Sequence, residues 1–220
     1  MPYNFTASDD FFTSQKNITT LVKFAREQDR KGNQDNRNLF LKLSVVTLVT
    51  RFQVYVESVL KEFDFKIKQT NKVNRDIPLH FRLNSIKIET SKKPIHVRLE
   101  NPTEYNAAKF TEINTLIALL NNWCDDNNII HPDLKFETKY PLGAQGLSEL
   151  KKLFKQIDGK DIFSKARFDI EKLNEILRRR HDIIHEDNNQ QLTELSVTNY
   201  KKFMGTVVKF IDRYLNKIIA

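Results

Sequence analysis

The run RRRHDIIH, late in the chain, gathers side chains that can hold charge and move protons. It contains Arg180, His181 and His185. A guanidinium is a permanent cation with a rigid fork of N–H donors, and an imidazole can take up or release a proton near neutral pH. Residues of these types at such close spacing make this run the first candidate for a functional site.

Arg180 occupies a position where the helical pattern predicts an apolar side chain. At about 100° per residue, it falls in the middle of a stripe of apolar neighbours, which are Leu173, Ile176, Leu177, Ile183 and Ile184. Burying a guanidinium without a partner is costly, so Arg180 needs an acidic partner, a cleft or an interface. Such departures tend to mark functional sites, although a snorkelling arginine or a structural ion pair fits the same pattern.

The two histidines are four residues apart and share a helical face that borders Arg180. Arg180 and His185 are about 140° apart around the helix and about 7.5 Å apart along its axis. On a straight helix these two side chains therefore cannot close on one small group. They can line one wall of a groove for an extended ligand, and a two-fold related second copy can supply the facing wall.

The elements that position these residues follow a helical pattern. Apolar periodicity predicts helices over residues 8–30, 39–65, 106–127, 148–157, 161–185 and 197–219. The polar segment 31–38 reads as a loop. With only 5 Gly and 6 Pro, the chain favours long helices over a many-turned β sandwich. We predict an all-α helical bundle in a single domain, residues 1–220.

Residues 66–104 do not fit the helical pattern as well. Three X-Pro pairs in this region disfavour helix locally. The segments SIKIET (85–90) and PIHVRLE (94–100) alternate apolar and polar residues, which is typical of strands. We expect either a small hairpin or an irregular insertion here.

The composition limits the classes of protein and partner. The 220 residues are 40% hydrophobic and 29% charged, as in globular proteins. A single cysteine excludes a disulfide framework within the chain and a cysteine-based zinc site. The net charge of +8 favours a polyanionic partner. With no basic-then-apolar start and no run of about 18 apolar residues, we expect a cytoplasmic protein that does not bind a membrane.

The run from Arg180 to His185 resembles the Arg-x4-6-His motif of the HEPN superfamily. In that motif the residue after the arginine is usually polar, and His181 fits. The segment RFQVYVES (51–58) is similar to the aromatic-and-acid pattern on an early long helix of the RiboL-PSP and MAE-type branch. The resemblance extends loosely over the whole chain and implies a HEPN-like bundle.

The resemblance implies a metal-independent endoribonuclease without a cofactor, in which a 2′-hydroxyl attacks the adjacent phosphate. His185 would serve as general base or acid. Arg180 would bind the scissile phosphate, with His181 as a second donor. Glu57 is the candidate for holding Arg180 or His185, with a plain solvated residue as the alternative. Asp182 is expected to face solvent and to cap or pair locally.

The resemblance also implies a homodimer with the active cleft at its interface. There, Arg178 and Arg179 could follow the RNA backbone. A solvated basic helix end that complements the helix dipole explains these two residues equally well. HEPN ribonucleases often act as toxins or in defence against phage, so a separate antitoxin or regulatory protein is an expected partner.

Two rival interpretations remain open. His181 and His185 in HDIIH are spaced like the two zinc ligands of a metalloprotease motif, but Asp182 replaces the catalytic glutamate. No histidine follows His185, and Glu186 and Asp187 are too close in sequence to serve comfortably as a third ligand. The second rival is a non-catalytic HEPN module that binds RNA, a nucleotide or a protein.

Overall fold

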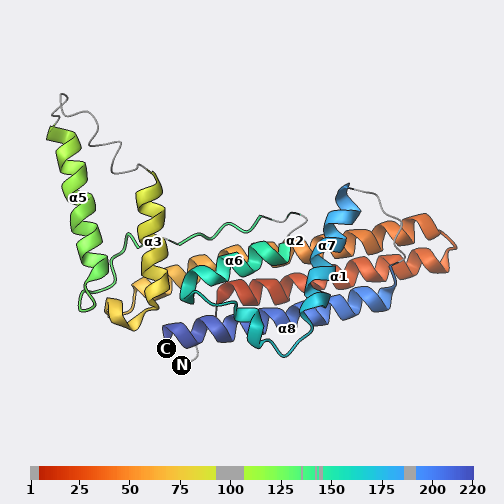
Figure 1. Ribbon diagram of the computed structural model, residues 1–220. Coiled ribbons are helices and arrows are strands. Elements are labelled where there is room, and N and C mark those ends of the chain that lie inside the picture. Colours follow the sequence, from red (N-terminus) through yellow and green to blue (C-terminus); the bar gives the residue numbers. More distant parts are fainter. Residues whose placement is uncertain (1–4, 93–106, 135, 142, 144–145, 186–191) are drawn as a thin grey trace. The chain divides into compact units, whose positions relative to one another are not determined.

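The computed structural model describes residues 5–92, 107–134, 136–141, 143, 146–185 and 192–220. This part of the chain is helical and contains no strand, which confirms the all-α prediction (Figure 1). The α-helices are α1 Thr6–Arg30, α2 Gln34–Lys68, α3 Leu79–Lys92, α5 Ala107–Cys124, α6 Gly146–Asp158, α7 Ile170–His185 and α8 Glu194–Ile219. Two short 3-10 turns accompany them, η1 Asn74–Asp76 and η2 Ile162–Lys165.

The chain divides into two compact units. Unit 1 comprises Met1–Phe63, Thr138–Leu153 and Asp161–Ala220, and unit 2 comprises Asp64–Glu137 and Phe154–Lys160. Unit 1 therefore holds α1, α7, α8, most of α2 and the start of α6. Unit 2 holds α3 and α5, together with the ends of α2 and α6. The run RRRHDIIH belongs to unit 1.

Unit 1 is built on three long helices, α1, α2 and α8, and α7 runs across their direction (Figure 1). Aromatic side chains join α1 to α2. The ring of Phe11 lies 6.5 Å from that of Phe52 and 5.8 Å from that of Tyr55, centroid to centroid. These three residues are at most 2% exposed. Burial of large aromatic side chains is the main source of stability in such a core.

Helix α2 is the central core element of unit 1. In the described part of the chain it is the one helix long and apolar enough to cross a membrane, with a mean hydropathy of 1.5 over 18 residues, 44% of them buried. Its apolar face is covered by the protein, with full burial at Leu41, Val45, Val49, Phe52, Val56, Val59, Leu60 and Phe63. This is the pattern of a core helix.

Helix α2 begins five residues earlier than the periodicity predicted, at Gln34 instead of Leu39. The Asn33 side chain explains the difference, because its Oδ1 accepts a hydrogen bond from the backbone N–H of Asn36 at 3.2 Å. An asparagine in this position satisfies a backbone donor at the start of a helix. The polar segment expected to be a loop is therefore mostly the capped first turns of α2.

A buried polar cluster lies among the three long helices. The Asp212 carboxylate accepts hydrogen bonds from the hydroxyls of Ser8 and Tyr55, both at 2.8 Å. Burial raises the pKa of Asp212, and the nearby Glu62 and Asp9 carboxylates act in the same direction. Burial and Asp212 likewise raise the pKa of Tyr55 well above its ordinary value. The cluster fixes α1, α2 and α8 in register through hydrogen bonds.

Unit 2 contains the segment SIKIET, and the hairpin expectation for it is wrong. Residues 85–90 lie within α3, which begins just after Pro78. The buried positions Phe81 and Ser85 are one helical turn apart, and Ser85 Oγ donates to the Phe81 carbonyl at 3.1 Å. The alternation of polar and apolar residues is too short to override this spacing. The segment PIHVRLE lies outside the described residues.

Polar side chains fasten the turns of unit 2. Asn74 Nδ2 donates to the carbonyls of Asn122 and Asp125, at 2.7 and 2.8 Å, close to the end of α5. The buried Arg82 donates to the Trp123 carbonyl and forms a 2.8 Å ion pair with Asp126. These contacts satisfy the free carbonyls at the C-terminus of α5.

Candidate functional site

Helix α7 carries the candidate site at its C-terminal end. It begins after Asp169, whose carboxylate accepts a hydrogen bond from the backbone N–H of Lys172 at 3.2 Å, as an N-cap residue does. Leu173, Ile176 and Leu177 are at most 2% exposed and anchor the first turns in unit 1. The apolar stripe inferred from the sequence is thus present over this part of the helix.

Arg180 lies where the buried stripe meets the surface. Its side chain is half-buried, and its Nε atom is shielded from solvent. An arginine side chain carries a planar guanidinium with a fork of N–H donors. Arg180 therefore has an Nε atom that is shielded from solvent and a guanidinium that carries a positive charge. Both features suit an anion-binding residue.

His181 and His185 lie together at the end of α7. Their ring centroids are 4.5 Å apart, and the ring planes make an angle of 46°. His181 is half-buried, whereas His185 is exposed. Among the described residues, the buried Nδ1 of His181 has no hydrogen-bond partner. The structure therefore brings the two imidazoles together on the helix that also carries Arg180, with His185 on the solvent side.

Arg179 is occupied by contacts within unit 1. Its Nε forms an ion pair with Glu175 Oε1 at 2.9 Å, and its guanidinium carbon lies 5.6 Å from the centroid of the Tyr200 ring. The Tyr200 hydroxyl donates to the same carboxylate oxygen at 2.7 Å. Burial and this hydrogen bond raise the pKa of Tyr200 to about 12. This cluster ties α7 to α8.

Arg178 differs from Arg179 because it is exposed, and among the described residues no hydrogen bond or ion pair involves its side chain. A solvated arginine can bind a phosphate without first breaking an ion pair. Arg178 is therefore the better placed of the two flanking arginines for contact with a nucleic-acid backbone.

Asp182 is buried, at 9% exposure, and the expectation that it faces solvent is wrong. Ile184, which the helical wheel placed in the buried stripe, is 45% exposed. The wheel assumed that one face is covered along the whole helix. α7 runs across the direction of α1, α2 and α8 (Figure 1), and near its end Asp182 is buried while Ile184 is exposed, so the covered face there differs from the one that the wheel predicted.

Glu57 has a different contact from the one expected. Its Oε1 accepts hydrogen bonds from the backbone N–H of Tyr140 at 3.1 Å and from Gln53 Nε2 at 3.4 Å. Gln53 Nε2 also donates to the Tyr140 carbonyl at 2.8 Å. Among the described residues, no hydrogen bond joins Glu57 to Arg180 or His185. Glu57 and Gln53 instead form hydrogen bonds with the backbone N–H and the backbone carbonyl of Tyr140, respectively.

Tyr140 links this contact on α2 to the start of α6. Its buried hydroxyl donates to the Gly146 carbonyl at 2.9 Å, and burial raises its pKa. A Cβ atom added to Gly146 would lie 3.4 Å from the Leu177 Cβ, so α7 passes close to the start of α6. Sequence reasoning missed Gln53 and Tyr140, because the order of the residues does not show that a loop tyrosine will lie against α2.

The described residues contain no group of three or more His, Cys, Asp or Glu side chains arranged to hold a metal ion. Glu186 and Asp187, which follow the two histidines, lie outside the described residues. The residues of the candidate site on α7 are thus Arg180, His181 and His185, with the exposed Arg178 on the same helix.

An all-α bundle with an Arg-x4-His run at the end of a late helix has the architecture and motif of HEPN proteins. The family described as RiboL-PSP-HEPN matches residues 9–217. The chain belongs to this family, which confirms the resemblance drawn from the motif. No curated protein and no solved structure matches the chain.

Proposed function

We propose that this protein is a metal-independent endoribonuclease that cleaves RNA through its own 2′-hydroxyl groups. The observation that carries the proposal is the proximity of the two imidazoles, whose ring centroids are 4.5 Å apart, on the helix end that also carries Arg180. Membership of the RiboL-PSP-HEPN family supports it, because the Arg-x4-6-His motif of HEPN nucleases implies this chemistry. The net charge of +8 favours a polyanionic substrate.

In the proposed reaction, the 2′-oxygen loses its proton and attacks the adjacent phosphorus. The bond from phosphorus to the 5′-oxygen of the next nucleotide breaks, and that oxygen takes up a proton. The products are a 2′,3′-cyclic phosphate and a 5′-hydroxyl end. His185 moves one of these protons, because it is the exposed imidazole. Arg180 stabilises the charge on the phosphate oxygens, and His181 assists as a second donor.

A homodimer completes the site in this proposal. Arg180 and His185 are about 7.5 Å apart along a helix axis, so the end of one α7 provides one wall of a groove. A second copy would provide the facing wall, and RNA would run between them. Arg178 would contact the backbone outside the scissile phosphate. Glu57 would act indirectly, through Tyr140, and Asp182 from the buried side of α7.

The test uses the full chain with a labelled RNA in the presence of EDTA. Wild type should cut, and a substrate with 2′-deoxyribose on the 5′ side of each cleavage position should remain intact. His185→Ala and Arg180→Ala should lose about 10²-fold or more of the rate. His131→Ala and Arg213→Ala serve as controls, since they remove the same residue types from positions on other elements.

The outcomes of this test separate the candidate functions. Cleavage that survives chelation but is lost in both site variants supports the nuclease. Loss of cleavage on chelation would favour a metal hydrolase at His181 and His185. Binding of RNA without cleavage would favour a non-catalytic module. Circular dichroism of each variant checks that a lost activity is not a lost fold.

We also propose that this nuclease acts in the cytoplasm as a toxin or phage-defence effector, held in check by a separate antitoxin or regulatory protein. Membership of the HEPN family supports this role. Induced expression should arrest growth, and His185→Ala should relieve the arrest. Harmless expression of an enzyme that is active in vitro would contradict the role.

A further inference from the structure

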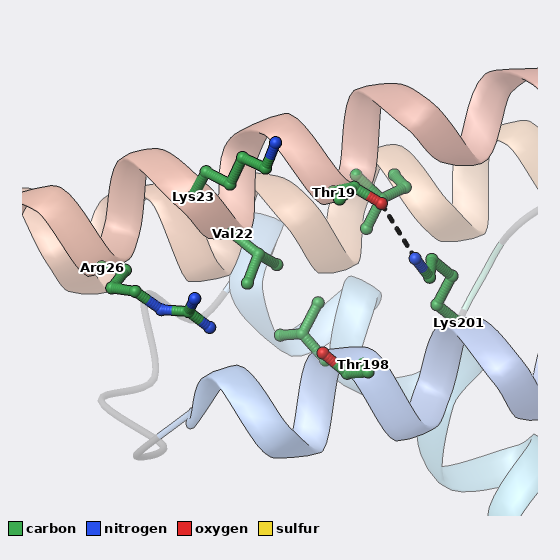
Figure 2. A pocket seen from close by; sticks show the side chains of 8 residues that line it. Thr19, Val22, Lys23, Arg26, Thr198 and Lys201 are labelled. Atoms are coloured by element: carbon green, nitrogen blue, oxygen red, sulfur yellow. Dashed lines mark hydrogen bonds between the residues drawn. The ribbon is translucent and has the colours of Figure 1, made fainter.

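A cavity of about 210 Å³ lies between α1 and α8 (Figure 2), and no motif residue of α7 is among the described residues that line it. Its apolar part is formed by Ile18, Val22 and Val197, of which Ile18 and Val197 are buried. Its charged part is formed by three cations, Lys23, Arg26 and Lys201. No acidic side chain is among the described residues that line it. The cavity therefore combines an apolar wall with a positive rim.

Arg26 and Lys201 lie at opposite ends of the gap between the two helices, with Val22 and Thr198 between them (Figure 2). Arg26 meets one carboxylate oxygen of Glu194, at 2.8 Å from Nη2 and 2.9 Å from Nε. A guanidinium has five N–H donors, so this contact leaves donors for a ligand. The Arg26 side chain is 55% exposed, so it can turn towards the gap.

The hydroxyl groups in the cavity are already donating to the backbone. Thr19 Oγ1 donates to the Gln15 carbonyl at 3.1 Å, and Thr198 Oγ1 donates to the Glu194 carbonyl at 2.8 Å. Lys201 Nζ donates to Thr19 Oγ1 at 2.9 Å, which uses one of its three protons. The donors left for a ligand are therefore on cations, which selects for an anion.

The size of the cavity limits the ligand. Pockets for drug-sized molecules occupy about 300–1,000 Å³. A cavity of about 210 Å³ holds roughly seven water volumes at about 30 Å³ each. This suits a phosphate group and the adjoining part of its organic group, which would lie on the apolar wall, while the rest of a larger ligand would extend outside the cavity.

We propose that the cavity between α1 and α8 is a binding site for a small phosphate-bearing ligand. Lys201 and Arg26 bind the phosphate oxygens from two sides, and Lys23 adds positive charge at the rim. Val22 and Val197 contact the organic part. The ligand is either a free phosphate compound or the phosphate at the end of an RNA strand. The site is separate from the proposed nuclease residues.

Isothermal titration calorimetry on the full chain tests the site with inorganic phosphate, AMP and the uncharged nucleoside adenosine. Wild type should bind AMP saturably and adenosine much more weakly. Lys201→Met and Arg26→Met should each weaken AMP binding at least tenfold. Lys202→Met is the matched control, because Lys202 is the next residue on α8, is exposed and does not line the cavity. Lys201→Arg should restore most of the affinity.

Glu194→Gln distinguishes a binding role from a structural one. It removes the carboxylate that competes for Arg26, so it should tighten AMP binding, which damage to the fold would not do. Arg180→Ala should leave this binding unchanged, which separates the site from the proposed active site. No saturable binding of a phosphate compound or a 5′-phosphorylated RNA, or binding that Lys201→Met and Arg26→Met do not affect, would overturn the proposal.

A second series of binding measurements, with AMP and with RNAs that differ only at the 5′ end, identifies the source of the phosphate. If AMP binds in the absence of RNA, the ligand is a free phosphate compound. The ligand is an RNA end if AMP does not bind but an RNA with a 5′-phosphate binds more tightly than the same RNA with a 5′-hydroxyl. In that case Lys201→Met should remove the difference between the two RNAs. Both results support the cavity as a phosphate site.

Discussion

The imidazole rings of His181 and His185 lie with their centroids 4.5 Å apart at the C-terminal end of α7. His181 is half-buried and His185 is exposed. A proton acceptor or donor must reach the reacting oxygen within hydrogen-bond distance, so the exposed ring is the better candidate for proton transfer. The half-buried ring is better placed to orient its neighbour or to bind a phosphate oxygen.

The first prediction follows from this difference. His185→Ala should lower the single-turnover rate of RNA cleavage by about 10²–10⁴-fold. His181→Ala should lower it by a smaller factor, because it removes an assisting donor. Rates at saturating enzyme measure both effects. A loss in His181→Ala as large as that in His185→Ala would contradict the assignment of their roles.

The second prediction compares two adjacent arginines. Arg178→Ala should weaken RNA binding and reduce the slope of log affinity against log salt by about 0.7, the value for one contact to a single-stranded phosphate. Its free energy of unfolding should stay unchanged, since Arg178 is exposed. Arg179→Ala should instead lower stability, because it removes the contacts with Glu175 and Tyr200. Equal salt slopes for wild type and Arg178→Ala would contradict the backbone role.

The third prediction concerns Glu57. Glu57→Gln keeps an oxygen that can accept from the Tyr140 N–H, so stability and cleavage should both stay close to wild type. Glu57→Ala removes the acceptor and should cost about 1–3 kcal/mol, the range for a backbone donor left without a partner. Urea denaturation and cleavage assays measure these effects. A Glu57→Gln variant that is stable but inactive would show that the negative charge is needed for catalysis.

The fourth prediction is the pH dependence of stability due to Asp212. Its pKa is raised in the folded state from the ordinary 3.8, so the native protein holds the proton more tightly than the unfolded chain. The contribution of the protonated Asp212 carboxyl to the free energy of unfolding is fully present below pH 3.8. It is lost as pH rises through the pKa of Asp212 in the folded state. Asp212→Asn keeps the acceptor for Ser8 and Tyr55 but cannot titrate.

Urea denaturation between pH 3.5 and pH 7 should therefore show a flatter pH profile for Asp212→Asn than for wild type. Asp10→Asn, at an exposed position on α1, is the matched control and should keep the wild-type profile. Identical profiles for Asp212→Asn and wild type would show that the half-buried Asp212 carboxylate makes no contribution to the pH dependence of stability.

The fifth prediction compares two glycines with positive φ. Gly32 has φ 70° and Gly159 has φ 79°. Either change to alanine should cost about 1–2 kcal/mol for the left-handed backbone. A Cβ at Gly159 would also lie 3.1 Å from His80 Nδ1, whereas nothing lies within 4 Å of one at Gly32. Gly159→Ala should therefore be the more destabilising in urea denaturation, and an equal or smaller loss would contradict the contact.

The sequence predicted most helices of unit 1 well because their apolar faces are long and regular. The helix predicted over 161–185 is an exception, because α7 begins only at Ile170 and a 3-10 turn, η2, occupies Ile162–Lys165. The end of α1, predicted at residue 30, lies at Arg30, and α8 ends at Ile219 as expected. The prediction failed where the decisive residues are polar. Asn33 caps α2, and Ser85 lies in the buried face of α3. A hydrophobic pattern gives no weight to such residues.

The candidate site was predictable only within one helix. The spacing of His181 and His185 placed both rings on one face, and the structure brings them together. The contacts of Glu57 and the burial of Asp182 depend on how segments far apart in the sequence meet, which helical periodicity does not describe. A helical wheel gives the direction in which a side chain leaves its helix, but not the residues of other elements that lie next to it.

Helix α1 has no side-chain cap of its own, since Phe5 occupies the N-cap position. The Glu62 carboxylate on α2 accepts from the backbone N–H of Thr6 at 2.8 Å and of Ala7 at 2.7 Å, across 56 and 55 positions of sequence. The first turn of α1 is thus completed by a different helix. A peptide of residues 5–30 would fray at this end. During folding, the first turn of α1 can form stably only after α2 has packed against it and placed Glu62 at its N-terminus.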